Sequence, residues 1–135
     1  MRELVLSQKE LEGLIPHLPQ SGVILLRGDA SSGKTTLVKA WLRTLGVTEG
    51  VRSPTFTLMQ KYEARGLEIY HYDLYQIGLE GLLRRGLFEN LFEEGLHLVE
   101  WGCVRLEEAL KKMHLRPFVL EISFMENKRK YKIYE

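Results

Sequence analysis

Residues 28–36 read GDASSGKTT, and what stands on either side of this stretch decides the fold. The apolar run at residues 23–26 comes directly before it, and a helix-like run at residues 37–42 comes directly after it. A strand that feeds a glycine-bounded loop, ends in Lys-Thr and opens a helix is the pattern of a P-loop that binds nucleoside triphosphates. At ordinary residue usage the pattern arises by chance in about half a percent of chains of this length. The stretch therefore predicts phosphate binding.

Each residue type in this loop has a physical role in holding a polyphosphate. Glycines at both ends let the backbone turn so that successive N–H groups point at phosphate oxygens, which the positive end of the following helix also attracts. A lysine ammonium then binds the β- and γ-phosphates, and a threonine hydroxyl takes one ligand position on Mg²⁺. The predicted nucleotide-binding residues of the loop are Gly28, Asp29, Ala30, Ser31, Ser32, Gly33, the lysine Lys34, the Mg²⁺ ligand Thr35 and Thr36, which closes the first helical turn.

Length and composition narrow the class of protein. A chain of 135 residues predicts one domain over residues 1–135 with a single core. The net charge of +1 gives no excess of positive charge that would attract a long stretch of nucleic acid. We therefore expect no DNA partner and only an indirect link to RNA. The lone cysteine, Cys103, excludes an intrachain disulfide and fits a reducing compartment. With no signal-peptide pattern at residues 1–6 and no apolar run of membrane-spanning length, we expect a cytoplasmic protein without a membrane partner.

Hydrophobic spacing and turn residues give the order of elements. We predict helices over residues 7–17, 34–45, 79–87, 88–92 and 104–113, and strands over residues 23–26, 55–62, 67–72, 96–99, 118–124 and 129–134. Strand–helix units mixed with two hairpins imply an α/β fold. We expect a three-layer P-loop NTPase-like sandwich whose sheet has parallel central strands and antiparallel edge hairpins. Ligands of such sheets bind at the rim where the parallel strands end.

Two carboxylates follow apolar runs and could reach this rim. Glu100 closes the run at residues 96–99, where an acid that serves the metal ion would sit, and Asp73 closes the run at residues 69–72 in the same way. Asp73 could instead cap the next turn. The predicted catalytic residues are Lys34, Asp73 and Glu100, and the predicted metal ligands are Thr35, Glu100 and Asp73. Sequence leaves open which acid is the base and which binds the metal.

Other polar residues give weaker signals. The loop at residues 52–58, RSPTFTL, could offer Thr55 and Thr57 to Mg²⁺ and the γ-phosphate, or could be a proline-fixed strand start with surface threonines. The basic hairpin around Arg129 is typical of a solvated edge, while a second interpretation brings Arg129 or Lys128 near the nucleotide. The histidines show no ligand spacing for zinc, and we expect those in strands to be ordinary packing residues.

Four motifs together make the chain recognisable. GDASSGKTTLVKA, VRSPTFTL, HYDLYQ and LVEW occur in the order and approximate spacing of the bacterial TsaE family, and the chain resembles this family from about Leu4 to the terminal hairpin. The family is the small ATPase of tRNA threonylcarbamoyladenosine biosynthesis. By resemblance, Lys34 and Thr35 are the phosphate and Mg²⁺ residues and Glu100 is the metal-side carboxylate. Further matched positions are Asp73 in the His-x-Asp-x-Tyr motif, Trp101 after the glutamate, and Thr55 and Thr57 in the Ser-Pro-Thr segment.

From the P-loop and the two acids we expect a Mg²⁺-dependent ATPase that turns over slowly alone and whose hydrolysis is coupled to a partner complex. The resemblance implies that the partners are TsaD-like and TsaB-like subunits. The family's pathway forms the threonylcarbamoyl group on adenosine 37 of tRNAs that read codons beginning with A. Two alternatives remain: a small-molecule kinase with Arg84 and Arg85 as a phosphate-clamping lid, and a module that binds ATP without turnover. A guanine-nucleotide switch is disfavoured because Asn127-Lys128 is not followed by the Asp of a guanine-selecting element.

Overall fold

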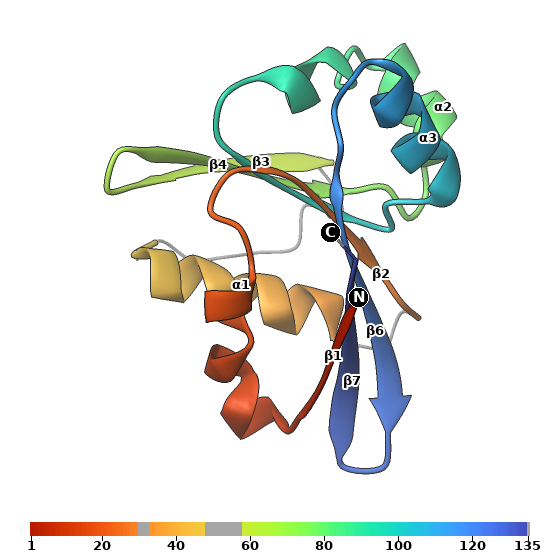
Figure 1. Ribbon diagram of the computed structural model, residues 1–135. Helices are drawn as coiled ribbons and strands as arrows, with labels where there is room; N and C mark the ends of the chain where they lie inside the picture. The colour runs from red at the N-terminus through yellow and green to blue at the C-terminus, as the bar shows by residue number, and fades with distance from the viewer. Residues whose placement is uncertain (30–32, 48–57, 135) are drawn as a thin grey trace.

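A computed structural model gives the fold and describes residues 1–29, 33–47 and 58–134. Its strands are separated by helices except in two hairpins, near the middle and at the end of the chain (Figure 1). The strands are β1 (Arg2–Leu6), β2 (Gly22–Arg27), β3 (Met59–Ala64), β4 (Leu67–Asp73), β5 (Leu96–Glu100), β6 (Phe118–Met125) and β7 (Lys128–Tyr134). The α-helices are α1 (Lys34–Leu45), α2 (Gly78–Arg84) and α3 (Val104–Lys112), and the 3₁₀-helices are η1 (Gln8–Gly13), η2 (Ile15–His17) and η3 (Glu89–Phe92).

Within the described residues, seven strands form one sheet in the order β1-β7-β6-β2-β5-β4-β3. The four central strands β6, β2, β5 and β4 run parallel to one another. At one edge β3 pairs antiparallel with β4, and at the other β7 pairs antiparallel with both β6 and β1. The predicted α/β class, with parallel strands at the centre and antiparallel hairpins at the edges, is therefore confirmed.

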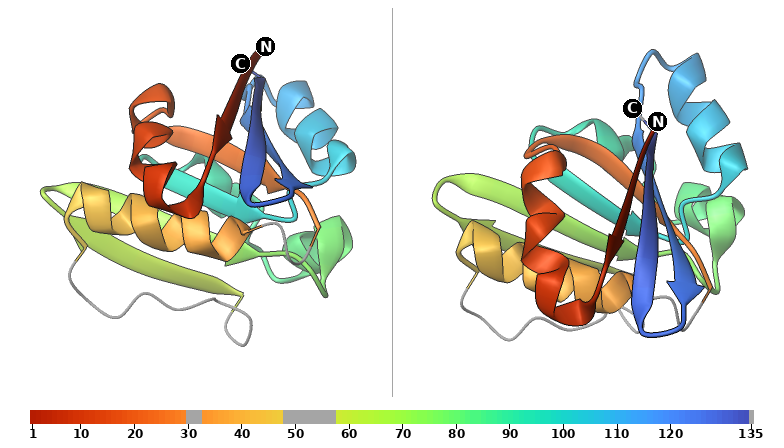
Figure 2. Two further views of the ribbon diagram at one scale, coloured as in Figure 1. Left: turned by 90° about the horizontal axis from the view of Figure 1, so that it is seen from below. Right: turned by 60° about the horizontal axis from the view of Figure 1, so that its bottom comes forward.

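The single core expected from the sequence is wrong: two hydrophobic cores lie on the two faces of the sheet and make the protein a three-layer sandwich. Side chains alternate between the faces along each strand. In β5, Leu96 and Leu98 join the core beneath α1 and the first two 3₁₀-helices, whereas Val99 joins the core beneath α2 and α3. Figure 2 shows α1 on one side of the sheet and α2 and α3 on the other. Each face consequently has its own set of buried neighbours.

The N-terminal segment differs from its prediction. The helix expected over residues 7–17 is wrong: the chain forms the two short 3₁₀-helices η1 and η2 instead. The capping box that suggested the helix does exist, since the Ser7 N–H donates to Glu10 Oε1 at 2.9 Å. Propagation then fails because Gly13 is a poor helix former and Pro16 has no N–H to donate. Capping therefore starts a turn here but does not make an α-helix.

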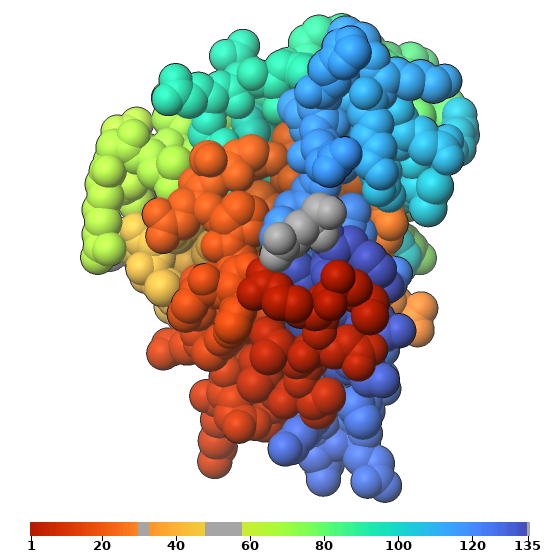
Figure 3. Space-filling view, viewed as in Figure 1, coloured from red at the N-terminus to blue at the C-terminus, as the bar shows by residue number. Residues whose placement is uncertain are grey.

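Strand β1 is an element that local patterning did not predict. It pairs with β7 at the far end of the chain, with Leu4 opposite Tyr131. The N-terminal residues (red) lie beside the β6–β7 hairpin (blue) on one face of the molecule (Figure 3). Among the strands expected elsewhere, the one predicted over residues 55–62 begins at Met59, and its residues 55–57 lie outside the described part of the chain.

The parallel strands bring their C-terminal ends to one edge of the sheet. β2 ends at Arg27 just before the glycine loop, and β4 and β5 end side by side at Asp73 and Glu100. No helix in residues 1–29, 33–47 and 58–134 combines the length and apolar character needed to cross a membrane.

Candidate nucleotide-binding site

Sheet register brings the predicted site residues together. Leu26 of β2 pairs with Glu100 of β5, which in turn pairs with Asp73 of β4. The glycine loop leaves β2 two residues after Leu26, and α1 begins directly after Gly33. Gly28 and Gly33 have positive φ angles of 149° and 102°, in the region that glycine adopts without steric cost. The turning role predicted for both glycines therefore fits the backbone.

Lys34 is buried at the first position of α1, and its ammonium group is fully engaged. Nζ donates to the main-chain oxygens of Gly28 at 2.5 Å and Asp29 at 2.7 Å. It also lies 3.9 Å from the centre of the Trp101 ring, within cation–π distance. An ammonium group held by carbonyl oxygens of the loop stands where phosphate oxygens would replace them. The site thus presents one desolvated cation at the place where a polyphosphate would enter.

Electrostatics at Lys34 work in two directions. Burial lowers the pKa of its ammonium group because the charged form loses hydration. The negative charges of Glu100, Asp29 and Asp73 oppose this shift, with Glu100 having the largest effect of the three. All three acids are therefore near enough to act on the lysine.

Thr35 and Glu100 form the second part of the site. The Thr35 hydroxyl donates to Glu100 Oε1 at 2.9 Å, although the two residues are 65 positions apart in the sequence. Hydroxyl and carboxylate oxygens are the hard ligands that Mg²⁺ prefers. The described residues contain no group of three or more His, Cys, Asp or Glu side chains arranged to hold a metal. This donor set fits Mg²⁺, which is usually held by one or two protein ligands and completes its shell with water and phosphate oxygens.

His71 is a site residue that sequence reasoning missed, because strand histidines were expected to be packing residues. It is fully buried in β4, and its Nε2 donates to Glu100 Oε2 at 2.5 Å. Both oxygens of Glu100 thus accept a hydrogen bond, one from Thr35 and one from His71. The alternation of β4 could have given the signal, since His71 is two residues before Asp73 and therefore faces the same side of the sheet.

Asp73 lies beside Glu100 but is held differently. Its carboxylate Oδ1 accepts the Tyr75 N–H at 3.0 Å, and its own N–H donates to Leu58 O at 3.0 Å. The turn-capping role considered from the sequence is thus present. Its negative charge also acts on Lys34, so capping does not remove it from the site.

Trp101 follows Glu100 and covers Lys34 through an unusual backbone conformation. Its φ angle is 65°, a left-handed conformation that is uncommon for residues other than glycine. The Trp101 N–H donates to Leu26 O at 2.9 Å, which ties this turn to β2. On its outer side the indole packs against Tyr75, with ring centres 4.8 Å apart, and Tyr75 is 62% exposed. The aromatic pair therefore joins the buried lysine to the protein surface.

The remaining predicted residues divide into three groups. Arg129 approaches the loop: a Cβ built on Gly33 would lie 3.8 Å from its Nε, and the guanidinium stacks on Phe124. Thr36 is exposed on the first turn of α1. The predicted residues Ala30, Ser31, Ser32, Thr55 and Thr57 lie outside the described part of the chain.

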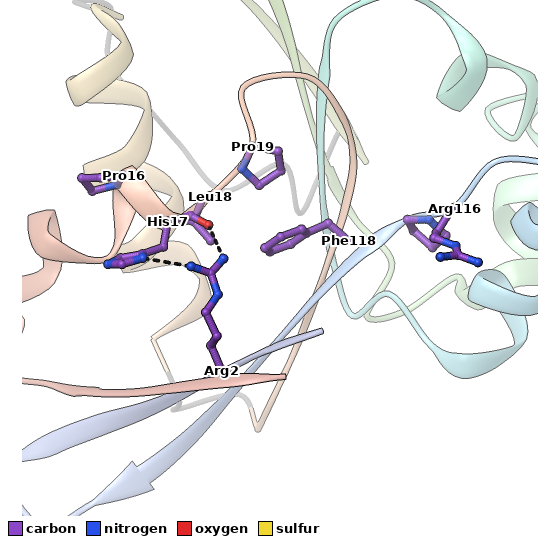
Figure 4. A pocket seen from close by; sticks show the side chains of 8 residues that line it. Arg2, Pro16, His17, Leu18, Pro19, Arg116 and Phe118 are labelled. Carbon is purple, nitrogen blue, oxygen red and sulfur yellow. Dashed lines mark hydrogen bonds between the residues drawn. The ribbon is translucent and has the colours of Figure 1, made fainter. Parts of the chain in front are cut away.

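Two hollows elsewhere contain none of the predicted nucleotide-binding residues. One of about 450 Å³ opens at the opposite edge of the sheet, where β2 and β6 begin (Figure 4). There the Arg2 guanidinium lies 3.2 Å from His17 Nδ1 and donates to His17 O at 3.4 Å. The other, of about 410 Å³, is lined by Gln76, Ile77, Gly81, Arg84 and Arg85. Neither hollow has Lys34 or Glu100 in its lining.

Comparisons with known proteins show the family of this chain. The family model of the threonylcarbamoyl adenosine biosynthesis protein TsaE matches residues 6–132. The tRNA threonylcarbamoyladenosine biosynthesis protein TsaE of Aquifex aeolicus is 37% identical over an alignment of 142 residues. This alignment covers 99% of this chain and 96% of that protein. The Bacillus subtilis protein of the same name is 39% identical over 94 residues, which cover 70% of this chain and 58% of that protein.

A solved structure also resembles this fold. The crystal structure of Bacillus subtilis YdiB superimposes with a TM-score of 0.67 at 26% identity, over 98% of this chain and 84% of that one. The order of motifs, the three-layer sandwich and the match to the Aquifex protein over nearly the whole of both chains point to one conclusion. This P-loop chain belongs to the TsaE family, which has its role in the biosynthesis of threonylcarbamoyladenosine in tRNA.

Proposed function

We propose that this chain is a Mg²⁺-dependent ATPase required for forming the threonylcarbamoyl group on adenosine 37 of tRNAs that read codons beginning with A. In this proposal it acts through a complex with TsaD-like and TsaB-like subunits and contacts tRNA only indirectly. The observation that carries the proposal is the contact of Thr35 with Glu100 at 2.9 Å, next to the buried ammonium of Lys34. A cation beside a pair of hard oxygen ligands is what a triphosphate with its metal ion needs.

Lys34 binds the substrate in this mechanism. Its ammonium exchanges the main-chain oxygens of Gly28 and Asp29 for the β- and γ-phosphate oxygens of ATP. The helix begins at Lys34, so the N–H groups of its first turn, which lack helical partners, also face the incoming phosphates. Trp101 lies over the same ammonium and limits the access of water to it.

The two acids take separate roles. Thr35 and Glu100 would hold Mg²⁺, which when bound neutralises charge on the phosphate oxygens. Asp73 orients the attacking water and accepts its proton as the water oxygen bonds to the γ-phosphorus and the bond to the bridging oxygen breaks, releasing ADP. The hydrogen bond of Glu100 to Thr35 supports this division, because it ties Glu100 to the residue expected to bind the metal.

The test compares matched lysines on one helix. Lys34→Ala should weaken ATP binding about 10- to 100-fold, because a charge-assisted contact contributes about 1.5–3 kcal/mol. Lys39→Ala, which removes a lysine from the same helix outside the site, should leave the affinity unchanged. Calorimetry with Mg-ATP measures both. Equal affinities in the two variants would contradict the proposed site.

Turnover is tested with γ-³²P-ATP in the presence of the TsaD-like and TsaB-like subunits. We expect inorganic phosphate, formed faster with the partners than without them, and strong loss of turnover in Asp73→Asn and Glu100→Gln. Label on a small metabolite would favour the kinase alternative, and bound ATP without phosphate release would favour the binding module. In a reconstituted tRNA reaction, formation of the modified nucleoside without this chain would contradict the pathway role.

A further inference from the structure

The partners of His71 distinguish it from the other buried histidine of the sheet. His97 of β5 uses both ring nitrogens: Nε2 donates to Glu93 O at 2.8 Å, so Nδ1 accepts from the Tyr72 hydroxyl at 2.7 Å. His71 uses only Nε2, which donates to Glu100. Its Nδ1 is buried and has no hydrogen-bond partner among residues 1–29, 33–47 and 58–134. Burial of His71 Nδ1 is therefore unfavourable for folding, whereas both ring nitrogens of His97 are satisfied.

Packing alone does not explain an imidazole at this position. Neighbouring side chains on the same face, Ile69 in β4 and Leu98 in β5, are apolar and fully buried. A leucine or isoleucine would satisfy this environment, whereas a buried nitrogen without a partner is unfavourable. What the imidazole provides, and an apolar side chain would not, is the hydrogen bond from Nε2 to Glu100.

We propose that His71 is a positioning residue that fixes the carboxylate of Glu100 for the metal site. With Oε2 held by His71, rotation of the carboxylate is blocked and Oε1 stays directed at Thr35. His71 comes from β4 and Thr35 from α1, so the carboxylate is held from two elements. Partners that orient a metal ligand in this way commonly contribute 10- to 100-fold to metal affinity or activity. The inference rests on the proposed function, because it assigns Glu100 to Mg²⁺.

The experiment measures how much Mg²⁺ strengthens ATP binding. The ratio of the ATP dissociation constant in EDTA to that in saturating Mg²⁺ is determined by calorimetry for each variant. His71→Leu should lower this ratio about tenfold while leaving the constant in EDTA unchanged, because Lys34 and the loop main chain are untouched. In turnover with Mg²⁺, the KM for ATP should rise together with the dissociation constant of Mg-ATP, and kcat should fall as well.

Two further variants separate positioning from folding. His71→Gln keeps an N–H donor at the same number of bonds from the backbone as Nε2, so it should restore most of the ratio. His97→Leu removes an equally buried imidazole from the opposite face of the sheet and should lower thermal stability without changing the ratio. Thermal unfolding identifies the folded variants, and His71→Met replaces His71→Leu if the latter does not fold.

Several outcomes would overturn the inference. A wild-type ratio in His71→Leu would mean that the donor does not act on the metal site. Equal losses in His71→Leu and His71→Gln, or in His71→Leu and His97→Leu, would indicate a packing effect. Wild-type protein that binds ATP with no Mg²⁺ effect would remove the metal assignment of Glu100 together with the role of His71. Absence of ATP binding in the wild type would refute the proposed function itself.

Discussion

Gly102 offers the sharpest structural test, because it lies where the turn after Glu100 crosses β2. A Cβ built on Gly102 would lie 2.7 Å from Leu25 Cβ, 2.8 Å from Leu25 Cδ2 and 3.1 Å from Leu25 Cα. Leu25 is fully buried in a strand with neighbours on both sides, so its backbone cannot retreat. We expect Gly102→Ala to lower the free energy of unfolding by about 1–3 kcal/mol, the usual cost of overpacking a core.

The matched control is Gly13→Ala, where an added Cβ has no neighbour within 4 Å. This change should be neutral or stabilising by a few tenths to about 1 kcal/mol, because alanine restricts the unfolded chain. Urea unfolding measures both variants, and the midpoint of Gly102→Ala should fall while the slope stays constant. Thermal scans should show a loss of about 3–5 °C per kcal/mol for a domain of this size. Equal midpoints for the two variants would refute the close approach of Gly102 to Leu25.

Two more predictions concern the aromatic and histidine groups. Burial lowers the pKa of His97, so below about pH 6.5 the unfolded state binds a proton that the folded state resists, and stability should decline as pH falls. Urea midpoints at pH 8 and pH 5.5 measure this decline, which should shrink in His97→Leu; an unchanged decline would assign it to another group. Mg-ATP should change tryptophan emission, because nucleotide draws Lys34 away from Trp101 while Trp41 is 99% buried. Emission that still responds in Trp101→Phe would contradict that origin.

The centre of the fold could be predicted because its signals are local. A short apolar run, two glycines and a Lys-Thr pair specify β2, the loop and α1 within residues 22–45, and Gly46 ends the helix with a φ of 100°. Glu100 and Asp73 could be placed at the same rim because each closes an apolar run, and parallel strands bring their C-terminal ends to one edge of the sheet. Pattern and topology together therefore gave the positions of both acids.

The features that were missed depend on contacts between distant residues. β1 exists because β7, more than 120 positions away, provides its hydrogen-bonding partner, and no local pattern contains that information. Likewise, the hydrogen bond from His71 to Glu100 joins two residues that are 29 positions apart and lie on adjacent strands. The contact of Trp101 with Lys34 depends on a left-handed backbone conformation that sequence did not suggest. The helix expected at residues 7–17 does not form for a local reason, because Pro16 has no N–H to donate to a continuing helix.

Because neighbouring residues in β4 and β5 point to opposite sides, these two strands place residues of the proposed site on one face of the sheet and residues that pack and stabilise the fold on the other. His71 and Glu100 face α1 and the proposed metal site, whereas Tyr72 and His97 face α2 and α3. Sequence drift beneath α2 and α3 can be offset by any compensating change in the same layer. Changes at His71 and Glu100 themselves have no such remedy, because these groups must keep their positions at the proposed metal site. Engineering for heat tolerance should therefore begin in the layer that holds His97.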